Sequence, residues 1–92
     1  MFVASEDYGD QGLSLDRRLI RRPSATFFFN ASEDCPQAGV RRGDLLIVDR
    51  AEPAAPGRAV VAVDGGELRV LKLSAGGAAE IWGVVLWIVR AP

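Results

Sequence analysis

The order of hydrophobic and polar residues along the chain predicts a protein built almost entirely of β-strands. Apolar runs of strand length alternate with short segments rich in glycine, proline and acidic residues. The predicted strands cover residues 25–31, 44–49, 58–63, 67–73 and 81–90. The pattern therefore indicates an all-β fold, and the chain of 92 residues has the length of one domain.

A β-hairpin is the clearest local feature of this pattern. Asp64, Gly65 and Gly66 separate the apolar runs 58–63 and 67–73. Glycine readily adopts the positive φ angles that tight hairpin turns need. The two strands are therefore expected to pair with each other in antiparallel fashion.

The last predicted strand, residues 81–90, is apolar on both faces. A strand with one face in water would instead alternate between apolar and polar residues. It therefore needs cover on both sides, which either a second subunit or a sheet rolled up on itself can give. Trp82 and Trp87 are accordingly candidate interface residues.

The start of the chain has a different character. Residues 1–12 show no periodicity and predict an extended or mobile arm. Ser14 can cap a short helix that ends at Arg22, because the proline that follows disfavours helical angles in the residue before it. The chain therefore divides into an N-terminal arm with a short helix (1–22) and a β-domain (23–92).

The predicted arm is acidic and carries two apolar aromatic side chains, Phe2 and Tyr8. Segments of this kind dock on partners through a few apolar anchors and become ordered as they bind. Phe2 and Tyr8 are therefore expected to contact a partner protein.

Charge and composition narrow the possible functions. The formal net charge is −1, so the surface as a whole offers no field that would hold nucleic acid, and direct nucleic-acid binding is not expected. A basic cluster does occur next to the acidic residues of the arm, and it is interpreted as a solvated charged face; it consists of Arg17, Arg18, Arg21 and Arg22. No residue pattern calls for a cofactor or a metal ion.

Cys35 is the single cysteine, which excludes an internal disulfide and suits a reducing compartment. The N-terminus lacks the basic and apolar regions of a secretory signal, and the apolar run 81–89 is too short to cross a bilayer as a helix. We therefore expect a cytoplasmic protein without membrane contact.

Three stretches in this order resemble the LexA/UmuD-type self-cleaving serine peptidases, and processed UmuD most of all. They are residues 22–28 (Arg-Pro-Ser-Ala-Thr-Phe-Phe), 43–50 (Gly-Asp-Leu-Leu-Ile-Val-Asp-Arg) and 81–85 (Ile-Trp-Gly-Val-Val). The resemblance implies the LexA/signal-peptidase-like fold of coiled antiparallel sheets. The fold is expected to be shortened, because a glycine-rich linker between Leu73 and Ile81 replaces a longer family segment.

The resemblance places Cys35 at the nucleophile position. In the family, a loop of the form Ser-Gly-Asp-Ser-Met carries the nucleophile as its second serine. The matching loop here, residues 32–36, reads Ser-Glu-Asp-Cys-Pro and is followed by a segment one residue shorter than usual. The loop is therefore expected to be altered, and Cys35 is expected not to cleave a peptide bond.

The resemblance also places Leu71 at the general-base position, where the family has an unprotonated lysine in a Thr-Val-Lys-(Lys or Arg)-Leu strand. Leucine accepts no proton. Lys72 is next to it, but alternation along a strand predicts that Lys72 points to the far side of the sheet. A β-bulge near Val70 would turn it back and make it a substitute base. Loss of the base predicts negligible self-cleavage.

Three functional hypotheses follow from the resemblance. The first is a non-catalytic, UmuD-like subunit of the DNA-damage (SOS) response that assists translesion synthesis; the family implies a homodimer or mixed dimer, a translesion DNA polymerase subunit and a RecA filament as partners. It fits a chain that resembles the already processed form of the family. The second is a residual peptidase in which Cys35 attacks with help from Lys72. The third is a regulatory partner that forms mixed dimers with LexA/UmuD-type homologues.

Overall fold

The computed structural model describes residues 2–4, 20, 22–77 and 79–92, and in these ranges the chain is all-β. Two short 3₁₀ turns, η1 and η2, accompany the strands. The elements are β1 (Phe2–Ala4), η1 (Pro23–Ala25), β2 (Thr26–Ala31), η2 (Pro36–Ala38), β3 (Leu45–Asp49), β4 (Ala59–Asp64), β5 (Glu67–Lys72) and β6 (Glu80–Val89). The predicted fold class is confirmed.

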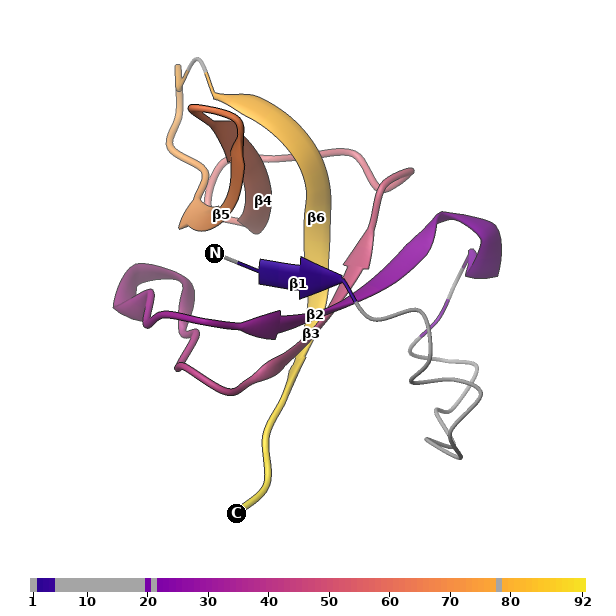
Figure 1. Cartoon of the computed structure of the whole chain (residues 1–92). Helices are drawn as coiled ribbons and strands as arrows, with labels where there is room; N and C mark the ends of the chain where they lie inside the picture. Colours follow the sequence, from indigo (N-terminus) through magenta and orange to yellow (C-terminus); the bar gives the residue numbers. More distant parts are fainter. Residues whose placement is uncertain (1, 5–19, 21, 78) are drawn as a thin grey trace.

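The described strands form a single antiparallel sheet in the order β1-β2-β3-β6-β4-β5. The long strand β6 lies at the centre, pairing with β3 along its C-terminal half and with β4 along its N-terminal half. The sheet curls into a half-barrel in which the β4–β5 hairpin lies at one end of β6 and β1, β2 and β3 cross the other end (Figure 1). One strand therefore joins both ends of the fold.

Two irregularities in β6 bend the sheet. Against β3 the pairing passes from Trp87 to Val85, and against β4 it passes from Gly83 to Ile81. Leu86 and Trp82 are thus extra residues, and such β-bulges increase the local bend and twist of a strand. The apolar pattern of this strand could be explained by a second subunit or by a sheet rolled up on itself. The curled sheet provides the second kind of cover, from within the chain.

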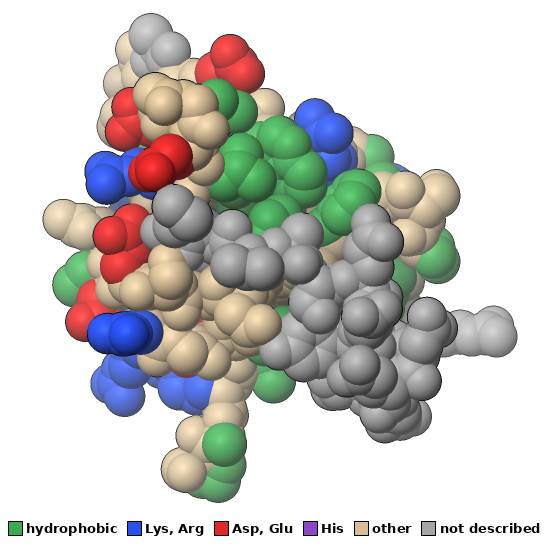
Figure 2. Space-filling view, viewed as in Figure 1, with side chains coloured by type: hydrophobic (Ala, Val, Ile, Leu, Met, Phe, Trp, Pro, Cys, Tyr) green, Lys and Arg blue, Asp and Glu red, His purple; other side chains and the backbone are tan. Residues whose placement is uncertain are grey.

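The main core lies on the inner face of the curl. It consists of Phe29, Ala31, Val40, Leu46, Val48, Val61, Val70 and Val85. Trp82 packs against it, with its ring centroid 5.2 Å from those of Phe27 and Phe29 in edge-to-face arrangements. Hydrophobic side chains are visible beside the β4–β5 hairpin in the space-filling view (Figure 2).

Each strand predicted from the sequence is found within one residue of its expected ends. The hairpin prediction is also confirmed, since Asp64 pairs with Glu67 and the two turn residues, Gly65 and Gly66, have φ angles of 59° and 82°. Apolar runs and turn glycines therefore located the strands of the described domain correctly.

The N-terminal predictions agree less well with the structure. Phe2–Ala4, expected in an extended or mobile arm, is extended and forms β1, which pairs with β2. Most of the helix predicted over residues 14–22 lies outside the described residues, and its described members Ile20 and Arg22 are not helical. Backbone pairing with β2, which sequence periodicity cannot detect in three residues, accounts for β1. The division of the chain at residue 22 stays a prediction.

No helix within the described ranges is both long and apolar enough to span a membrane.

Candidate functional site

The loop between β2 and β3 is fixed by backbone hydrogen bonds around Cys35. Cys35 N–H donates to the Val40 carbonyl at 2.9 Å, and Val40 N–H donates back at 3.0 Å. Between them lies η2, which Gly39 ends in the left-handed conformation with a φ angle of 72°. This position favours glycine, because other side chains are strained there. The main chain of the predicted nucleophile residue is therefore held in place.

The Cys35 side chain is half-buried and packs against the inner core. Its thiol is free of disulfide bonding, and Sγ lies 3.9 Å from Oε1 of Gln37, which can accept a weak hydrogen bond from the S–H group. The thiol thus has an amide oxygen as its neighbour within the loop.

A surface pocket of about 560 Å³ brings together the three residues that the sequence assigned to the catalytic positions, namely Cys35, Leu71 and Lys72. The remaining lining residues are Gln37, Gly57, Val70, Leu73 and Ser74. The pocket forms because η2 packs against β5. Cys35 and Lys72, which are 37 positions apart in the chain, therefore line one pocket.

Strand pairing determines which β5 side chain shares a face with the core. Val70 pairs with Val61, and both belong to the inner core against which Cys35 packs. Side chains alternate along a strand, so the Lys72 side chain leaves the sheet on the same face as Val70. The Leu71 side chain leaves on the other face, where Leu71 pairs with Val60. By this argument Lys72 shares the Val70 face, and no bulge near Val70 is needed for this placement. Leu71 and Lys72 both line the pocket, however, so the expected position of Lys72 on the far side of the sheet stays a prediction.

Lys72 nevertheless lacks the surroundings of a catalytic base. Its side chain is exposed, and within the described part of the chain it forms no hydrogen bond or ion pair, with Cys35 or with any other residue. A lysine acts as a base when apolar burial favours its neutral amine. The pocket therefore holds a thiol and an amine that are not joined to each other.

A second set of polar contacts surrounds Asp44, which is 2% exposed. Arg90 Nε and Nη2 donate to the two Asp44 carboxylate oxygens at 2.9 and 2.6 Å, and Arg41 N–H donates at 2.8 Å. The pKa of Asp44 is lowered from its ordinary value, mainly because of the hydrogen bonds from Arg90. The same pairing raises the pKa of Arg90.

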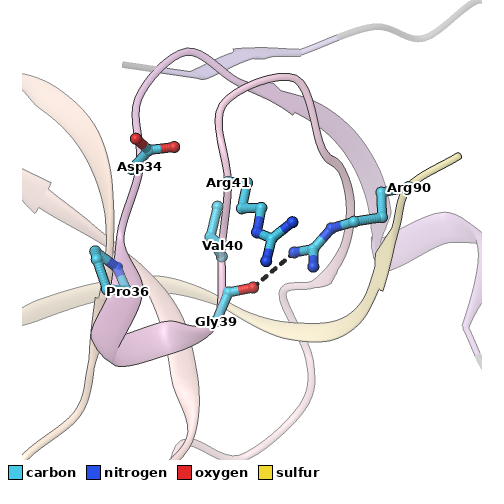
Figure 3. A pocket seen from close by; sticks show the side chains of 6 residues that line it. All are labelled: Asp34, Pro36, Gly39, Val40, Arg41 and Arg90. Atoms are coloured by element: carbon cyan, nitrogen blue, oxygen red, sulfur yellow. Dashed lines mark hydrogen bonds between the residues drawn. The ribbon is translucent and has the colours of Figure 1, made fainter. Parts of the chain in front are cut away.

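Arg90, held by Asp44, forms one side of a second pocket, of about 490 Å³ (Figure 3). Arg90 also donates from Nη2 to the Gly39 carbonyl at 2.8 Å. The six residues that line this pocket are Asp34, Pro36, Gly39, Val40, Arg41 and Arg90. Sequence reasoning missed it, because no local pattern connects the β2–β3 loop with the end of β6.

A third polar group anchors the start of the β-domain. Arg22 Nη1 donates to Asp49 at 2.9 Å and to Glu52 at 3.1 Å, and Asp49 is fully buried. The hydrogen bond to Glu52, followed by that to Asp49, raises the pKa of Arg22. Arg22 is thus an exposed residue that pairs with acidic residues of the β-domain. The other three arginines of the predicted cluster lie outside the described residues.

The predicted interface residues fall into different environments. Trp82 is engaged within the chain, since the Arg50 guanidinium lies 4.3 Å from its ring centroid. Trp87 is 44% exposed. Phe2 belongs to β1, of which only the backbone is described, and Tyr8 lies outside the described residues. Trp87 is therefore the residue of this set with a large apolar surface open to a partner.

Within the ranges that the structure describes, no three side chains of His, Cys, Asp or Glu gather closely enough to hold a metal ion.

A curled antiparallel sheet with Cys35 facing β5 across a pocket is the arrangement that the resemblance to self-cleaving peptidases implied. Residues 2–82 match the Peptidase S24-like family, and the chain belongs to that family. The LexA/UmuD-type affinity expected from the sequence is confirmed, with proteins of the UmuD type among its relatives.

Individual relatives agree with this assignment. The chain is 52% identical over 68 residues to Protein ImpA of Escherichia coli, a match that covers 73% of this chain and 47% of the relative. It is 43% identical over 68 residues to Protein SamA of Salmonella typhimurium (73% and 49%) and 37% identical over 70 residues to Protein MucA of Escherichia coli (75% and 48%). The chain spans about half the length of the curated relatives it matches.

Proposed function

We propose that this protein is a non-catalytic, UmuD-like interaction subunit that assists error-prone translesion DNA synthesis in the DNA-damage response. The observation that carries the proposal is the pocket at Cys35. This pocket brings together Cys35, Leu71 and Lys72, and the lysine is exposed and unbonded in the described part of the chain. Similarity to ImpA, SamA and MucA supports a UmuD-type role.

The chemistry of the two altered positions supports the absence of cutting. A thiol attacks as its thiolate, and it needs a nearby base or cation to form that thiolate at neutral pH. Leu71 supplies neither, and Lys72 forms no hydrogen bond with the Cys35 sulfur. Loss of a general base alone lowers a rate about 10² to 10⁴-fold. Self-cleavage by this site is therefore expected to be negligible.

Function without catalysis requires protein contacts. We propose a homodimer or a mixed dimer with a homologue, a translesion DNA polymerase subunit and a RecA-type filament as partners, as family resemblance implies. Trp87 supports a role for β6 in one of these contacts, because its ring is largely exposed on the central strand. Direct DNA binding forms no part of the proposal, since the formal net charge is −1.

Affinity purification from cells with DNA damage tests this role. Tagged protein should recover a translesion polymerase subunit, a RecA-type filament or both, detected by immunoblotting, and undamaged cells serve as the control. Recovery of neither would overturn the proposal. Recovery of a LexA-type repressor alone, in mixed dimers, would instead favour the regulatory-partner hypothesis.

A residual cysteine peptidase is the second candidate, because the register places Lys72 on the same sheet face as Val70, beside the pocket that contains Cys35. The family that the chain resembles cuts between alanine or cysteine and glycine, so this candidate predicts cleavage of a peptide that carries an Ala-Gly bond and the loss of this cleavage in Cys35→Ala. If wild type and Cys35→Ala leave the peptide equally intact, this candidate is excluded.

A further inference from the structure

The pocket of Figure 3 places two guanidinium groups side by side at the base of the β2–β3 loop. Arg90 reaches it from the end of β6, and Arg41 reaches it from the loop itself (Figure 3). Arg90 is fixed there by its bonds to Asp44 and to the Gly39 carbonyl. The pocket therefore has one side, Arg90, that is held in place by these bonds, and a second guanidinium, that of Arg41, beside it.

The two arginines differ in how their charge is balanced. The positive charge of Arg90 is neutralised by the buried carboxylate of Asp44. The Arg41 side chain forms no hydrogen bond or ion pair with any residue of the described ranges, although its charge is a minor cause of the lowered pKa of Asp44 and its backbone N–H donates to Asp44. Arg41 thus presents up to five N–H donors that no described residue uses.

We propose that this pocket binds a carboxylate side chain from an acidic peptide segment of a partner protein, with Arg41 as the residue that pairs with it. A guanidinium is planar and binds a carboxylate through two parallel hydrogen bonds. Pro36 and Val40 give the pocket apolar surface against which a peptide can pack. Its volume of about 490 Å³ has room for an acidic side chain and the adjoining main chain.

Charge around the pocket favours a peptide over nucleic acid. Asp34 lines the pocket as well, and acidic and basic side chains lie next to each other on this side of the molecule (Figure 2). A phosphate backbone is instead held by a continuous basic surface that releases several counterions. A single carboxylate needs only one unpaired arginine. This inference rests on the pocket alone and holds whether or not the protein assists a polymerase.

Arg41 and Arg42 form a matched pair for testing this site. Both side chains are exposed, and both backbone N–H groups donate to carboxylates at 2.8 Å, Arg41 to Asp44 and Arg42 to Asp34. Truncation to alanine keeps these backbone bonds and changes the net charge equally. Only Arg41 lines the pocket.

The test is fluorescence anisotropy of a labelled oligoglutamate peptide with the full chain at low ionic strength. We expect saturable binding of oligoglutamate and no binding of an oligoglutamine peptide. Arg41→Ala should weaken the binding of oligoglutamate about tenfold or more, and Arg42→Ala should weaken it less than about twofold. Equal weakening by both variants would show a diffuse charge effect and overturn the proposal. The proposal would also be overturned if oligoglutamate did not bind, or if a duplex oligonucleotide bound more tightly than oligoglutamate in a way that depends on Arg41. Circular dichroism spectra of both variants check that the fold is kept.

Discussion

Asp44 and Arg90, 46 residues apart in the sequence, are joined by two hydrogen bonds of 2.9 and 2.6 Å. The pair ties the loop that carries Cys35 to the C-terminal end of β6. Since Arg90 also donates to the Gly39 carbonyl, one side chain fixes both the start of β3 and the end of η2. The geometry of both pockets depends on this contact.

Replacement of Asp44 by asparagine should lower stability and alter its dependence on pH. The folded-state pKa of Asp44 lies below the ordinary value of 3.8, so its ionised form stabilises the fold. This contribution is complete above the ordinary value and is lost as pH falls from there through the lower folded-state pKa. Thermal unfolding should show Asp44→Asn several degrees below wild type at neutral pH, with the gap closing under acid.

The comparison of Asp44→Asn with wild type at acidic pH decides whether the Asp44 charge stabilises the fold. A gap between Asp44→Asn and wild type that stays constant from neutral pH to below pH 3.8 would show that the Asp44 charge does not stabilise the fold. Asp64→Asn is the control, because Asp64 is exposed and lies 3.8 Å from Arg69 at the surface. Exposed pairs of this kind contribute about 0 to 1 kcal/mol, so its effect should be small.

Gly83 should not tolerate a side chain. A Cβ atom at this position would lie 2.7 Å from Cγ1 of Val48, where β6 passes over the core. Overpacking of a core costs about 1 to 3 kcal/mol, and the free energy of unfolding measured in urea should fall by this amount in Gly83→Ala. Adding Val48→Ala removes the clash, so the double variant should be more stable than the sum of the two single effects predicts. Simple additivity would refute a direct contact.

The two tryptophans of β6 should respond differently to truncation. Trp82→Ala removes edge-to-face contacts with Phe27 and Phe29 and should destabilise the fold by about 3 kcal/mol. Trp87 is largely exposed, so Trp87→Ala should leave unfolding nearly unchanged while it weakens self-association measured by analytical ultracentrifugation. A Trp87→Ala protein that associates as wild type does would exclude this residue from a self-association interface.

The reactivity of Cys35 should not depend on Lys72. The two side chains line one pocket but form no bond, so Lys72→Gln should leave the rate of thiol alkylation across pH unchanged within about twofold. Arg69→Gln, which removes an exposed charge from the opposite face of β5, is the matched control. A thiol that reacts faster than a free cysteine at neutral pH, and slows only in Lys72→Gln, would revive the peptidase interpretation.

The strands could be predicted from the sequence because their signals are local. Apolar runs and the Gly65-Gly66 turn depend on neighbouring residues, and both appear as expected. The bulges at Trp82 and Leu86 depend on how β6 pairs with two other strands, which no local pattern encodes. The family resemblance implied coiled sheets, but the positions of these bulges had to be seen in the structure.

The candidate site was predictable in its members but not in its orientation. Resemblance to the family selected Cys35, Leu71 and Lys72, and the structure brings them to one pocket. Alternation along β5 sends the Leu71 and Lys72 side chains to different faces, yet both residues line the pocket, so which of them points toward Cys35 stays a prediction. The Asp44–Arg90 contact was not predicted, because its partners are 46 residues apart and Arg90 lies outside the three stretches that carry the resemblance.

The central claim is that this protein acts in damage-induced mutagenesis without cutting a peptide bond. The most direct measurement is the frequency of damage-induced mutation in cells that lack their own UmuD-type subunit and express either wild type or Cys35→Ala. We predict that both raise the frequency equally above that of cells with an empty vector. An increase with wild type that Cys35→Ala abolishes, or no increase with either folded protein, would contradict the claim.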